Sequence, residues 1–333
     1  MSTKQRTSEN TQHVRDGAHW IGVDLGGTKV LAGLFDDDLK VLSRCKLPTE
    51  PEKGEDHIFG QIRSATEGVL SQSGVAADQV RGLGLGIPGQ IDPIHHVVRY
   101  APNLGWNDVP LRDRLQSHCP WPTFVQNDVQ VGTYGEYVRG AAQGAKHVLG
   151  IFVGTGVGGG LVINGEIYHG FNYSAGEIGH TIIHWKKGQS LESIAGRRAM
   201  MQRAEKMLAD SPKKERKHWK DVKPAKIKSS QMAKMYADQD PIIVELIDEA
   251  AEALGAAIGS CLNLLSPEII VIGGGVAGAL GQPFLDKIWE IALKYSLPRS
   301  SVGVKLVPAA LADDSGIVGA AALVRAKVLA GVT

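Results

Sequence analysis

Two glycine-rich turns in this chain place backbone N–H groups beside hydroxyl and cationic side chains. An apolar run precedes and follows each turn, so each is predicted to be a β-hairpin; two ordinary tight hairpins without a ligand are the alternative. Glycines leave the N–H groups of a turn open, and open N–H groups form a nest that suits phosphate. We therefore expect the two turns to bind one polyphosphate chain between two lobes. The residues concerned are Gly26, Gly27, Thr28 and Lys29 in the first turn and Gly154, Thr155 and Gly156 in the second.

The elements around these turns alternate between strand and helix. Apolar runs bounded by turn residues predict strands, and apolar residues spaced by three and four positions predict helices. A start of two strands, a helix and another strand implies a mixed sheet with helices on its faces, so the predicted fold class is α/β. The predicted strands cover residues 21–25, 30–35, 41–47, 80–86, 122–126, 148–153, 161–163, 268–272 and 302–307, and the predicted helices cover 55–73, 111–117, 128–139, 241–265, 282–295 and 316–330, with another that begins near 190 or 192.

Length and composition restrict the class of protein. A chain of 333 residues exceeds the size at which a single core stops growing, so two domains are expected. With 43% hydrophobic and 21% charged residues and a formal net charge of +1, the composition gives no reason to expect a nucleic acid or a membrane as partner. No apolar run is long enough for a membrane span, and the N-terminus lacks the apolar core of a signal peptide. The scattered cysteines suggest reduced thiols in a cytoplasm: Cys45, Cys119 and Cys261.

Three stretches match the GxGxxG pattern of dinucleotide-binding proteins, at residues 84–89, 154–159 and 273–278. The first is not followed by a helix and the second is followed by a strand, so both lack the required context. The third follows a buried strand and precedes a helix, but the next strand ends without an acidic residue to bind a ribose. The glycines and lysine of residues 22–29 stand in the wrong order for a Walker A motif. A dinucleotide enzyme is therefore not expected.

Seven motifs follow one another along the chain: 21–29, 84–89, 101–104, 126–128, 154–159, 176–180 and 272–275. Their residues, order and spacing resemble those of the ROK family of bacterial sugar kinases and repressors, over about residues 20–330. The chain looks like a glucokinase-type member. The resemblance implies the actin-like ATPase fold, which has two ribonuclease-H-like lobes with mixed sheets flanked by helices, and a nucleotide and a sugar in the cleft between the lobes.

The resulting domain prediction has four parts. Residues 1–18 are expected to be a disordered tail, 19–126 a small α/β lobe and 127–310 a large α/β lobe. The C-terminal helix at 311–330 is expected to join the small lobe. A lysine-dense segment at 210–228 is predicted to be a solvated, mobile insertion, with a phosphate-attracting lid as the alternative.

The resemblance implies a role for each motif. Asp128 would be the catalytic base that takes the proton from the 6-hydroxyl of the sugar; from the sequence alone, a helix N-cap is an equal alternative. Asp24 would act through a magnesium ion and its waters. The nucleotide would contact the two turns and Gly273, Gly274 and Gly275. The sugar would contact Gly89, Asn103, Asn127, Asp128, Glu177, His180 and Glu192.

Three of these sugar contacts have ordinary alternatives. Asn103 alone would be interpreted as a turn residue. Glu177 and His180 are three residues apart, so they could be a surface ion pair on one helical face.

The segment after Glu177 departs from the family pattern. Many relatives have a cysteine cluster there that binds structural zinc with the histidine, whereas residues 180–192 contain no cysteine. Zinc needs about four N or S ligands, and His180 and His184 supply two at most. We therefore expect no zinc, and a different packing of this loop in which Trp185 is a candidate plug. The match of Glu192 to the sugar-binding glutamate of the family is weakened for the same reason.

The predicted function is ATP-dependent phosphorylation of a hexose, a transferase reaction of cytoplasmic carbohydrate metabolism and glycolysis. Glucose is the default substrate; N-acetylmannosamine, N-acetylglucosamine, fructose and allose kinases share the motifs, and polyphosphate-using glucokinases also lack the zinc cysteines. A sugar-sensing transcriptional regulator is the alternative class, but the residues before Trp20 are too few for a helix-turn-helix domain. Relatives suggest a homodimer. The expected cofactors are ATP and Mg²⁺.

Overall fold

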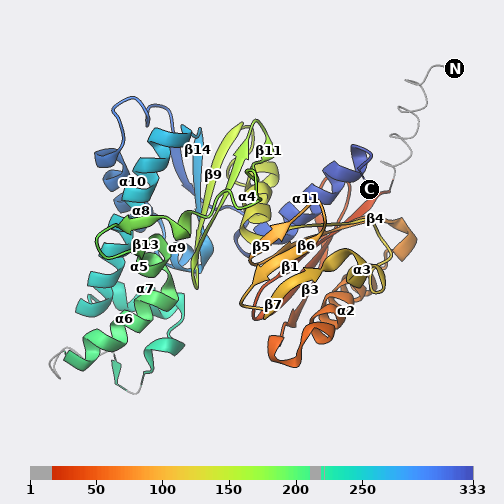
Figure 1. Ribbon diagram of the computed structural model, residues 1–333, viewed down its shortest axis with the longest axis horizontal. Coiled ribbons are helices and arrows are strands. Elements are labelled where there is room, and N and C mark those ends of the chain that lie inside the picture. Colours follow the sequence, from red (N-terminus) through yellow and green to blue (C-terminus); the bar gives the residue numbers. More distant parts are fainter. Residues whose placement is uncertain (1–16, 211–218, 221, 333) are drawn as a thin grey trace. The chain divides into compact units, whose positions relative to one another are not determined.

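The computed structural model describes residues 17–210, 219–220 and 222–332, and most of the expected N-terminal tail lies outside this range. Contacts between residues divide the chain into two compact units. Unit 1 comprises the described residues of Met1–Gly140, His169–Ala175 and Asp313–Thr333. Unit 2 comprises those of Ala141–Tyr168 and Gly176–Ala312. Each unit contains a five-stranded mixed sheet with helices (Figure 1).

The sheet of unit 1 begins with the predicted hairpin. Asp24 pairs with Leu31 and Leu25 pairs with Val30, and the turn is closed by a hydrogen bond from the Gly26 N–H to the Lys29 carbonyl at 2.8 Å. The strand order is β3-β2-β1-β4-β8, in which β1, β4 and β8 are parallel and the other pairs are antiparallel. The strands are β1 (His19–Leu25), β2 (Lys29–Phe35), β3 (Val41–Pro48), β4 (Val80–Ile87) and β8 (Thr123–Asn127).

Glycines alternate with bulky apolar residues along β4, and one glycine lies between two such residues in β1, so these strands have one face of bulky side chains and a glycine face. The bulky side chains of β1 and β4 join the core that contains α2 (Glu55–Ser73). On the other face, α11 (Ser315–Leu329) lies directly against the strands: a Cβ atom on Gly22 would lie 1.9 Å from the Ile317 carbonyl oxygen, and one on Gly84 1.9 Å from that of Ala320. The alternating glycines of β4 are therefore packing residues and not part of a dinucleotide site.

The same close packing joins α11 to α4 (Asp128–Arg139). A Cβ on Gly319 would lie 1.7 Å from the Val131 carbonyl oxygen, so only glycine allows the two helices to approach this closely. As a result α4 groups with unit 1, and the division of the chain falls after Gly140 instead of after Gln126.

Unit 1 also contains a three-stranded antiparallel sheet that the periodicity did not predict. Its strands are too short to show clear alternation, but they bury Val98 and Trp106, whose ring stacks on Phe59 at 5.4 Å between ring centroids. The sheet positions the turn that carries Asn103. Its elements are β5 (Gln90–Asp92), β6 (Val97–Ala101) and β7 (Trp106–Pro110), followed by α3 (Leu111–Gln116).

The sheet of unit 2 repeats the plan of a hairpin joined to parallel strands. Its order is β11-β10-β9-β14-β15, with β9, β14 and β15 parallel. The last strand begins at Lys305 and not at Val302, because Gly303 has φ 80°, a left-handed conformation that interrupts a strand. The strands are β9 (His147–Val153), β10 (Val157–Ile163), β11 (Glu166–Ile167), β14 (Ile269–Gly273) and β15 (Lys305–Pro308).

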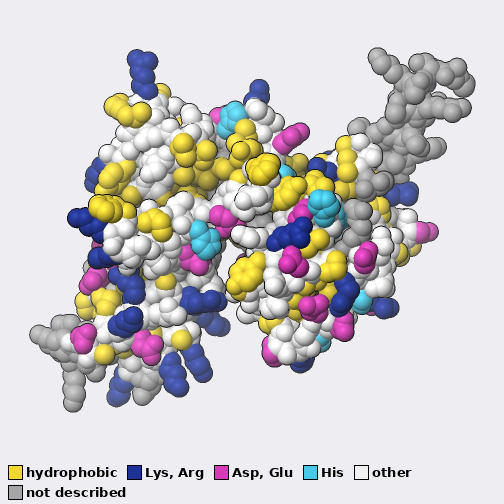
Figure 2. Space-filling view, viewed as in Figure 1, with side chains coloured by type: hydrophobic (Ala, Val, Ile, Leu, Met, Phe, Trp, Pro, Cys, Tyr) yellow, Lys and Arg dark blue, Asp and Glu magenta, His cyan; other side chains and the backbone are white. Residues whose placement is uncertain are grey.

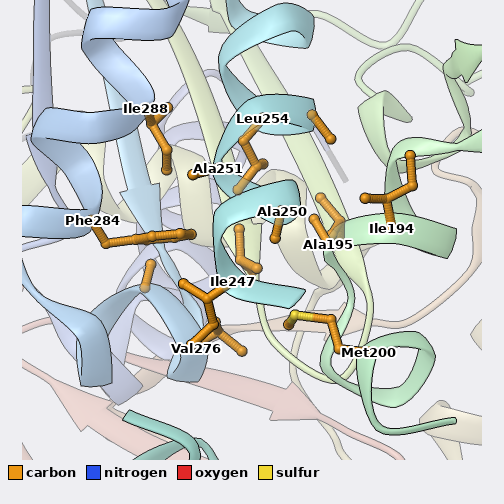
Figure 3. Close-up of a cluster of buried hydrophobic side chains, with 14 of the residues drawn as sticks. Ile194, Ala195, Met200, Ile247, Ala250, Ala251, Leu254, Val276, Phe284 and Ile288 are labelled. Atoms are coloured by element: carbon orange, nitrogen blue, oxygen red, sulfur yellow. The ribbon is translucent and has the colours of Figure 1, made fainter. Parts of the chain in front are cut away.

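The core of unit 2 is arranged around α8 (Pro241–Leu265). Figure 3 shows Ile247 and Leu254 of α8 between side chains from the segments that hold Ile194 and Met200 and those that hold Phe284 and Ile288. Because α8 is buried on two sides, its apolar residues extend almost around the helix. The other elements are β12 (Ile182–His184), β13 (Gln189–Ser190), α5 (Leu191–Ala195), α6 (Arg197–Asp210), α7 (Ser229–Ala237), α9 (Gly274–Leu280) and α10 (Gln282–Tyr295).

The described part of the lysine-dense segment is not a purely solvated insertion. Trp219 is buried and donates its indole N–H to the Asp240 carboxylate at 2.9 Å, and Ile227 is fully buried in the core. The prediction of a solvated segment is wrong for these residues, while residues 211–218 and 221 lie outside the described range. Figure 2 shows Lys and Arg side chains gathered over the part of unit 2 that contains α6 and α7. None of the helices in the described chain has both the length and the apolar character that crossing a membrane requires.

Candidate functional site

The first turn places a carboxylate beside a lysine. Asp24 lies at the end of β1, and a Cβ on Gly316, near the start of α11, would lie 2.9 Å from its Cγ atom. The Lys29 ammonium lies 3.1 Å from the exposed carboxylate of Asp313. Asp24 is thus held between the sheet, the first turn of α11 and a pair of opposite charges.

These surroundings raise the pKa of Asp24 from its ordinary value of 3.8 to about 6. Burial is the largest cause, because it disfavours the charged carboxylate. The positive charge of Lys29 lowers the pKa and the negative charge of Asp313 raises it. A bound divalent cation would favour the ionised form, so the site fits a role for Asp24 beside a magnesium ion that also binds phosphate oxygens and water.

Asn127 and Asp128 lie at the junction between β8 and α4, where they have different structural roles. The Asn127 side-chain oxygen accepts hydrogen bonds from the N–H groups of Val129 at 2.9 Å and Gln130 at 3.1 Å, so Asn127 is the N-cap. Its amide also donates to the Gly89 carbonyl at 3.0 Å. Asp128 is the first residue of the helix, is partly exposed and accepts from the Val129 N–H at 2.9 Å. The capping role that the sequence left open for Asp128 therefore belongs to Asn127.

Two other predicted residues of unit 1 each lie beside another predicted site residue. Asn103 lies in the turn between β6 and β7, and a Cβ on Gly27 would lie 3.4 Å from the Cβ of Asn103. Gly89 has φ 111° and is tied to Asn127 by the hydrogen bond described above. Unit 1 thus joins the first turn to Asn103, and Gly89 to Asn127.

The second turn is held by the start of α6. The hairpin closes with a hydrogen bond from the Gly154 N–H to the Gly156 carbonyl at 2.8 Å. The Arg197 N–H donates to the Gly154 carbonyl at 3.1 Å, and the Arg198 N–H donates to the Thr155 carbonyl at 3.0 Å. The Arg197 side chain also reaches the Thr155 hydroxyl, at 3.2 Å. Sequence motifs did not identify Arg197, because its contact with Thr155 is made across a long stretch of chain.

Three acidic and basic residues of unit 2 lie near the second turn. The Glu192 carboxylate accepts from the Val157 N–H at 2.8 Å, and a Cβ on Gly156 would lie 2.1 Å from it. Burial raises the pKa of Glu177, the charge of His180 lowers it and the charge of Glu192 raises it, so both of these side chains act on Glu177. Glu192 is therefore placed beside both the turn and Glu177, even though the family's cysteines are absent around it.

The third glycine set lies at the end of β14 and the start of α9. Gly274 has φ 87°, and a Cβ there would lie 2.4 Å from the Val153 carbonyl oxygen. Both the conformation and the space require glycine at this position. Because Val153 directly precedes Gly154, the structure brings the third glycine set next to the second turn.

The loop between His180 and Glu192 is held by backbone pairing. Ile182 pairs with Ser190 and His184 with Gln189, and the Leu191 N–H donates to the Thr181 carbonyl at 2.9 Å. Leu191 is fully buried and anchors the far end. Trp185 is 79% exposed, so it does not plug the loop as the sequence suggested. Within the described ranges no group of three or more His, Cys, Asp or Glu residues could hold a metal ion.

Comparison with known proteins covers nearly the whole chain. The model of the ROK family matches residues 20–327. The chain is 35% identical over 315 residues to a glucokinase from Halalkalibacterium halodurans, which covers 92% of this chain and 94% of that protein. It is 30% identical over 328 residues to a glucokinase from Thermotoga maritima, covering 92% and 98% respectively. The crystal structure of a ROK family glucokinase from Streptomyces griseus in complex with glucose and AMPPNP has a TM-score of 0.80 at 30% identity, covering 93% of this chain and 100% of that one.

Two mixed sheets with flanking helices, together with this likeness, define a protein of the actin-like ATPase class, which confirms the predicted fold. The chain belongs to the ROK family. The family predicted from the seven motifs is therefore confirmed.

Proposed function

We propose that this protein transfers the terminal phosphoryl group of ATP to the 6-hydroxyl of a hexose, with glucose as the default substrate. The glucokinases among its relatives support the reaction class and the substrate. The observation that carries the proposal is the position of Asp128: it opens α4 directly after β8, while Asn127 performs the capping. The Asp128 carboxylate is thus not needed as the N-cap of the helix.

Asp128 would act as the general base. The sugar oxygen attacks the terminal phosphorus, the bond from that phosphorus to the bridging oxygen breaks, and ADP leaves. Asp128 takes the proton of the attacking hydroxyl, a role that contributes about 10²- to 10⁴-fold in rate. Positioning and electrostatic stabilisation supply the rest, as in other phosphoryl transfers.

The remaining predicted residues would bind the two substrates. Sugar hydroxyls would pair with Gly89, Asn103, Asn127, Glu177, His180 and Glu192, since each hydroxyl buried without a partner is costly. Phosphate oxygens would bind at Gly26, Gly27, Thr28, Lys29, Gly154, Thr155 and Gly156, with Gly273, Gly274 and Gly275 beneath the adenosine. Magnesium would neutralise charge on the phosphates, with Asp24 holding it through water.

We further propose that the protein works in the cytoplasm as a homodimer. The three cysteines of the chain are all free thiols, which suits a reducing compartment. Light scattering of the purified protein tests the oligomeric state, and a monomer at working concentration would contradict the dimer.

A coupled assay of ADP release tests the catalytic proposal. Wild type and Asp128→Asn are compared with glucose, N-acetylmannosamine, N-acetylglucosamine, fructose and allose, using ATP or polyphosphate as donor. We expect glucose and ATP to give the highest kcat/KM, and the Asn variant to lose about 10²-fold or more in kcat while glucose still binds. Absence of turnover with every sugar, or a fully active Asn variant, contradicts the proposal.

A further inference from the structure

The start of α6 fixes the direction of the N–H groups in the second turn. The carbonyls of Gly154 and Thr155 both accept from the first N–H groups of α6, at 3.1 and 3.0 Å. In a trans peptide the N–H points opposite to the carbonyl of the same unit, and no peptide described in this chain is cis. The N–H groups of Thr155 and Gly156 therefore point away from α6, and they donate to no acceptor among the described residues.

The Arg197 side chain completes this arrangement. One guanidinium nitrogen, Nη1, donates to the Ile227 carbonyl at 2.9 Å, and the other, Nη2, donates to the Thr155 hydroxyl oxygen at 3.2 Å. A hydroxyl that accepts a hydrogen bond keeps its own proton to donate elsewhere. The positive charge of Arg197 is thus held next to the hydroxyl and the two N–H groups of the turn.

We propose that Arg197 is a positioning residue for the phosphate chain of the donor. It orients the Thr155 hydroxyl as a donor toward a phosphate oxygen and adds a fixed positive charge beside the turn. The inference rests on the proposed kinase function, because it assumes that the second turn binds the donor. The ligand it fits is a P–O–P chain, which ATP and inorganic polyphosphate share.

Arginine suits this role better than lysine. The guanidinium is planar and presents several N–H donors in a fixed fork, so it reaches the Thr155 hydroxyl and the Ile227 carbonyl together. A lysine has one nitrogen on a flexible stem and could not hold both partners with the same geometry. We therefore expect Arg197→Lys to keep the charge but lose most of the positioning.

The test measures steady-state kinetics for Arg197→Met, Arg197→Lys, Thr155→Val and the double variant Arg197→Met with Thr155→Val. Lys206→Met is the matched control, since Lys206 is an exposed cation on the same helix without a described side-chain contact. We expect kcat/KM for ATP to fall about 10- to 100-fold in Arg197→Met, the effect of a hydrogen bond to a charged group. In the double variant, kcat/KM for ATP should fall little further than in the more impaired single variant, because both substitutions remove the same Arg197–Thr155 interaction.

Separate readouts distinguish positioning from folding. Glucose binding, followed by tryptophan fluorescence, should change less than about twofold in every variant, and the Lys206→Met control should match wild type. The inference would be overturned if Arg197→Met weakened glucose binding as much as it lowers kcat/KM for ATP. It would also be overturned if Lys206→Met lowered kcat/KM as much as Arg197→Met, or if the losses in the two single variants added up in the double variant. Where wild type uses polyphosphate, Arg197→Met should impair that donor as strongly as ATP, and an unimpaired polyphosphate reaction would also overturn it.

The positioning role of Arg197 can be refuted while the kinase function stands, and the kinase function can be refuted while the contact of Arg197 with the phosphate chain stands. Turnover in wild type together with an unaffected Arg197→Met variant leaves a kinase without the positioning role. If wild type phosphorylates no sugar, the kinase proposal fails, and calorimetry with AMPPNP still tests Arg197. Weaker AMPPNP binding by Arg197→Met than by Lys206→Met then supports its contact with the phosphate chain, and equal binding refutes it.

Discussion

Replacing Asp24 with Asn is expected to stabilise the protein at neutral pH and to remove its kinase activity. Asn has nearly the shape of a protonated Asp, so the substitution mimics the form that the folded site prefers. The wild-type site must hold a desolvated carboxylate whenever the pH exceeds about 6. The proposed function requires that ionised form, because it must favour a magnesium ion. Stability and activity therefore oppose each other at this residue.

The magnitude follows from the pKa. A rise from 3.8 to about 6, at about 1.36 kcal/mol for each pKa unit, corresponds to about 3 kcal/mol. The unfolded chain loses this proton near pH 3.8 and the folded chain near pH 6. The favourable contribution to wild-type folding is thus fully present below pH 3.8 and is lost as the pH rises to about 6. Because Asp24 is partly exposed, 3 kcal/mol is an upper figure.

Urea unfolding monitored by tryptophan fluorescence measures the effect. At pH 7.5 the unfolding free energy of Asp24→Asn should exceed that of wild type by up to about 3 kcal/mol, and at pH 4 by less than about 1 kcal/mol. Asp38→Asn is the matched control, since Asp38 is exposed, and it should match wild type at both pH values. A destabilised Asn variant, or a difference independent of pH, would refute the assignment of a costly charge to this site.

The same carboxylate predicts the pH dependence of catalysis. In wild type, kcat/KM for ATP should rise with pH and reach half of its plateau near pH 6, because this parameter reports ionisations of the free enzyme. Asp313→Asn removes a negative charge that raises the pKa of Asp24, so the midpoint should move to lower pH. A midpoint that stays in place or moves upward would contradict this account.

Three further outcomes are expected. Gly84→Ala should destabilise the protein by about 3 kcal/mol in thermal unfolding, since its Cβ would lie 1.9 Å from a backbone oxygen of α11. Gly60→Ala, in open space on α2, should stabilise the protein by up to about 1 kcal/mol. The reverse order of stabilities would contradict the packing of α11 on the sheet. Asn127→Ala should cost about 1 kcal/mol for the lost cap and raise KM for the hexose, and an unchanged melting temperature would speak against the cap. Treatment with 1,10-phenanthroline should leave the activity intact and elemental analysis should find less than about 0.1 zinc per chain, whereas inactivation reversed by zinc would disprove the zinc-free loop.

Sequence patterns predicted the long helices well because these helices combine a clear period with strong boundaries. The bounds of α2, α4, α8 and α10 are those expected from the periodicity. Gly74, which has φ 72°, ends α2, and Asp240 followed by Pro241 begins α8. Such signals are local, so one sequence is enough to detect them.

Features that depend on distant residues were missed or misinterpreted. The three-stranded sheet of unit 1 has strands of three to five residues, which are too short for periodicity to identify. The lysines around Trp219 suggested a solvated segment, but a hydrogen bond to Asp240 and the burial of Ile227 fix its described end in the core. By contrast, the prediction that a buried strand precedes residues 273–278 and that a helix begins there is confirmed, because it rested on local patterns.

The candidate site shows the same division. Motifs pointed to Asp24, Asn127 and Asp128, but the sequence could not decide whether Asp128 is a helix N-cap, because Asp is a common N-cap and the capping bonds of Asn127 are visible only in the structure. Arg197 escaped notice because nothing near it in the sequence indicates that its side chain reaches Thr155. Contacts across a long loop are decided by packing, which a local pattern does not contain.

The glycine face of the unit 1 sheet has a consequence for the order of biosynthesis. A ribosome makes β1 and β4 early, but their cover, α11, is synthesised after the whole of unit 2. Until residues 315–329 emerge, the strands present bare backbone and apolar surface that can associate with other chains. Unit 1 is therefore begun first and completed last. A nascent chain halted shortly before its C-terminus would depend on chaperones to prevent its aggregation.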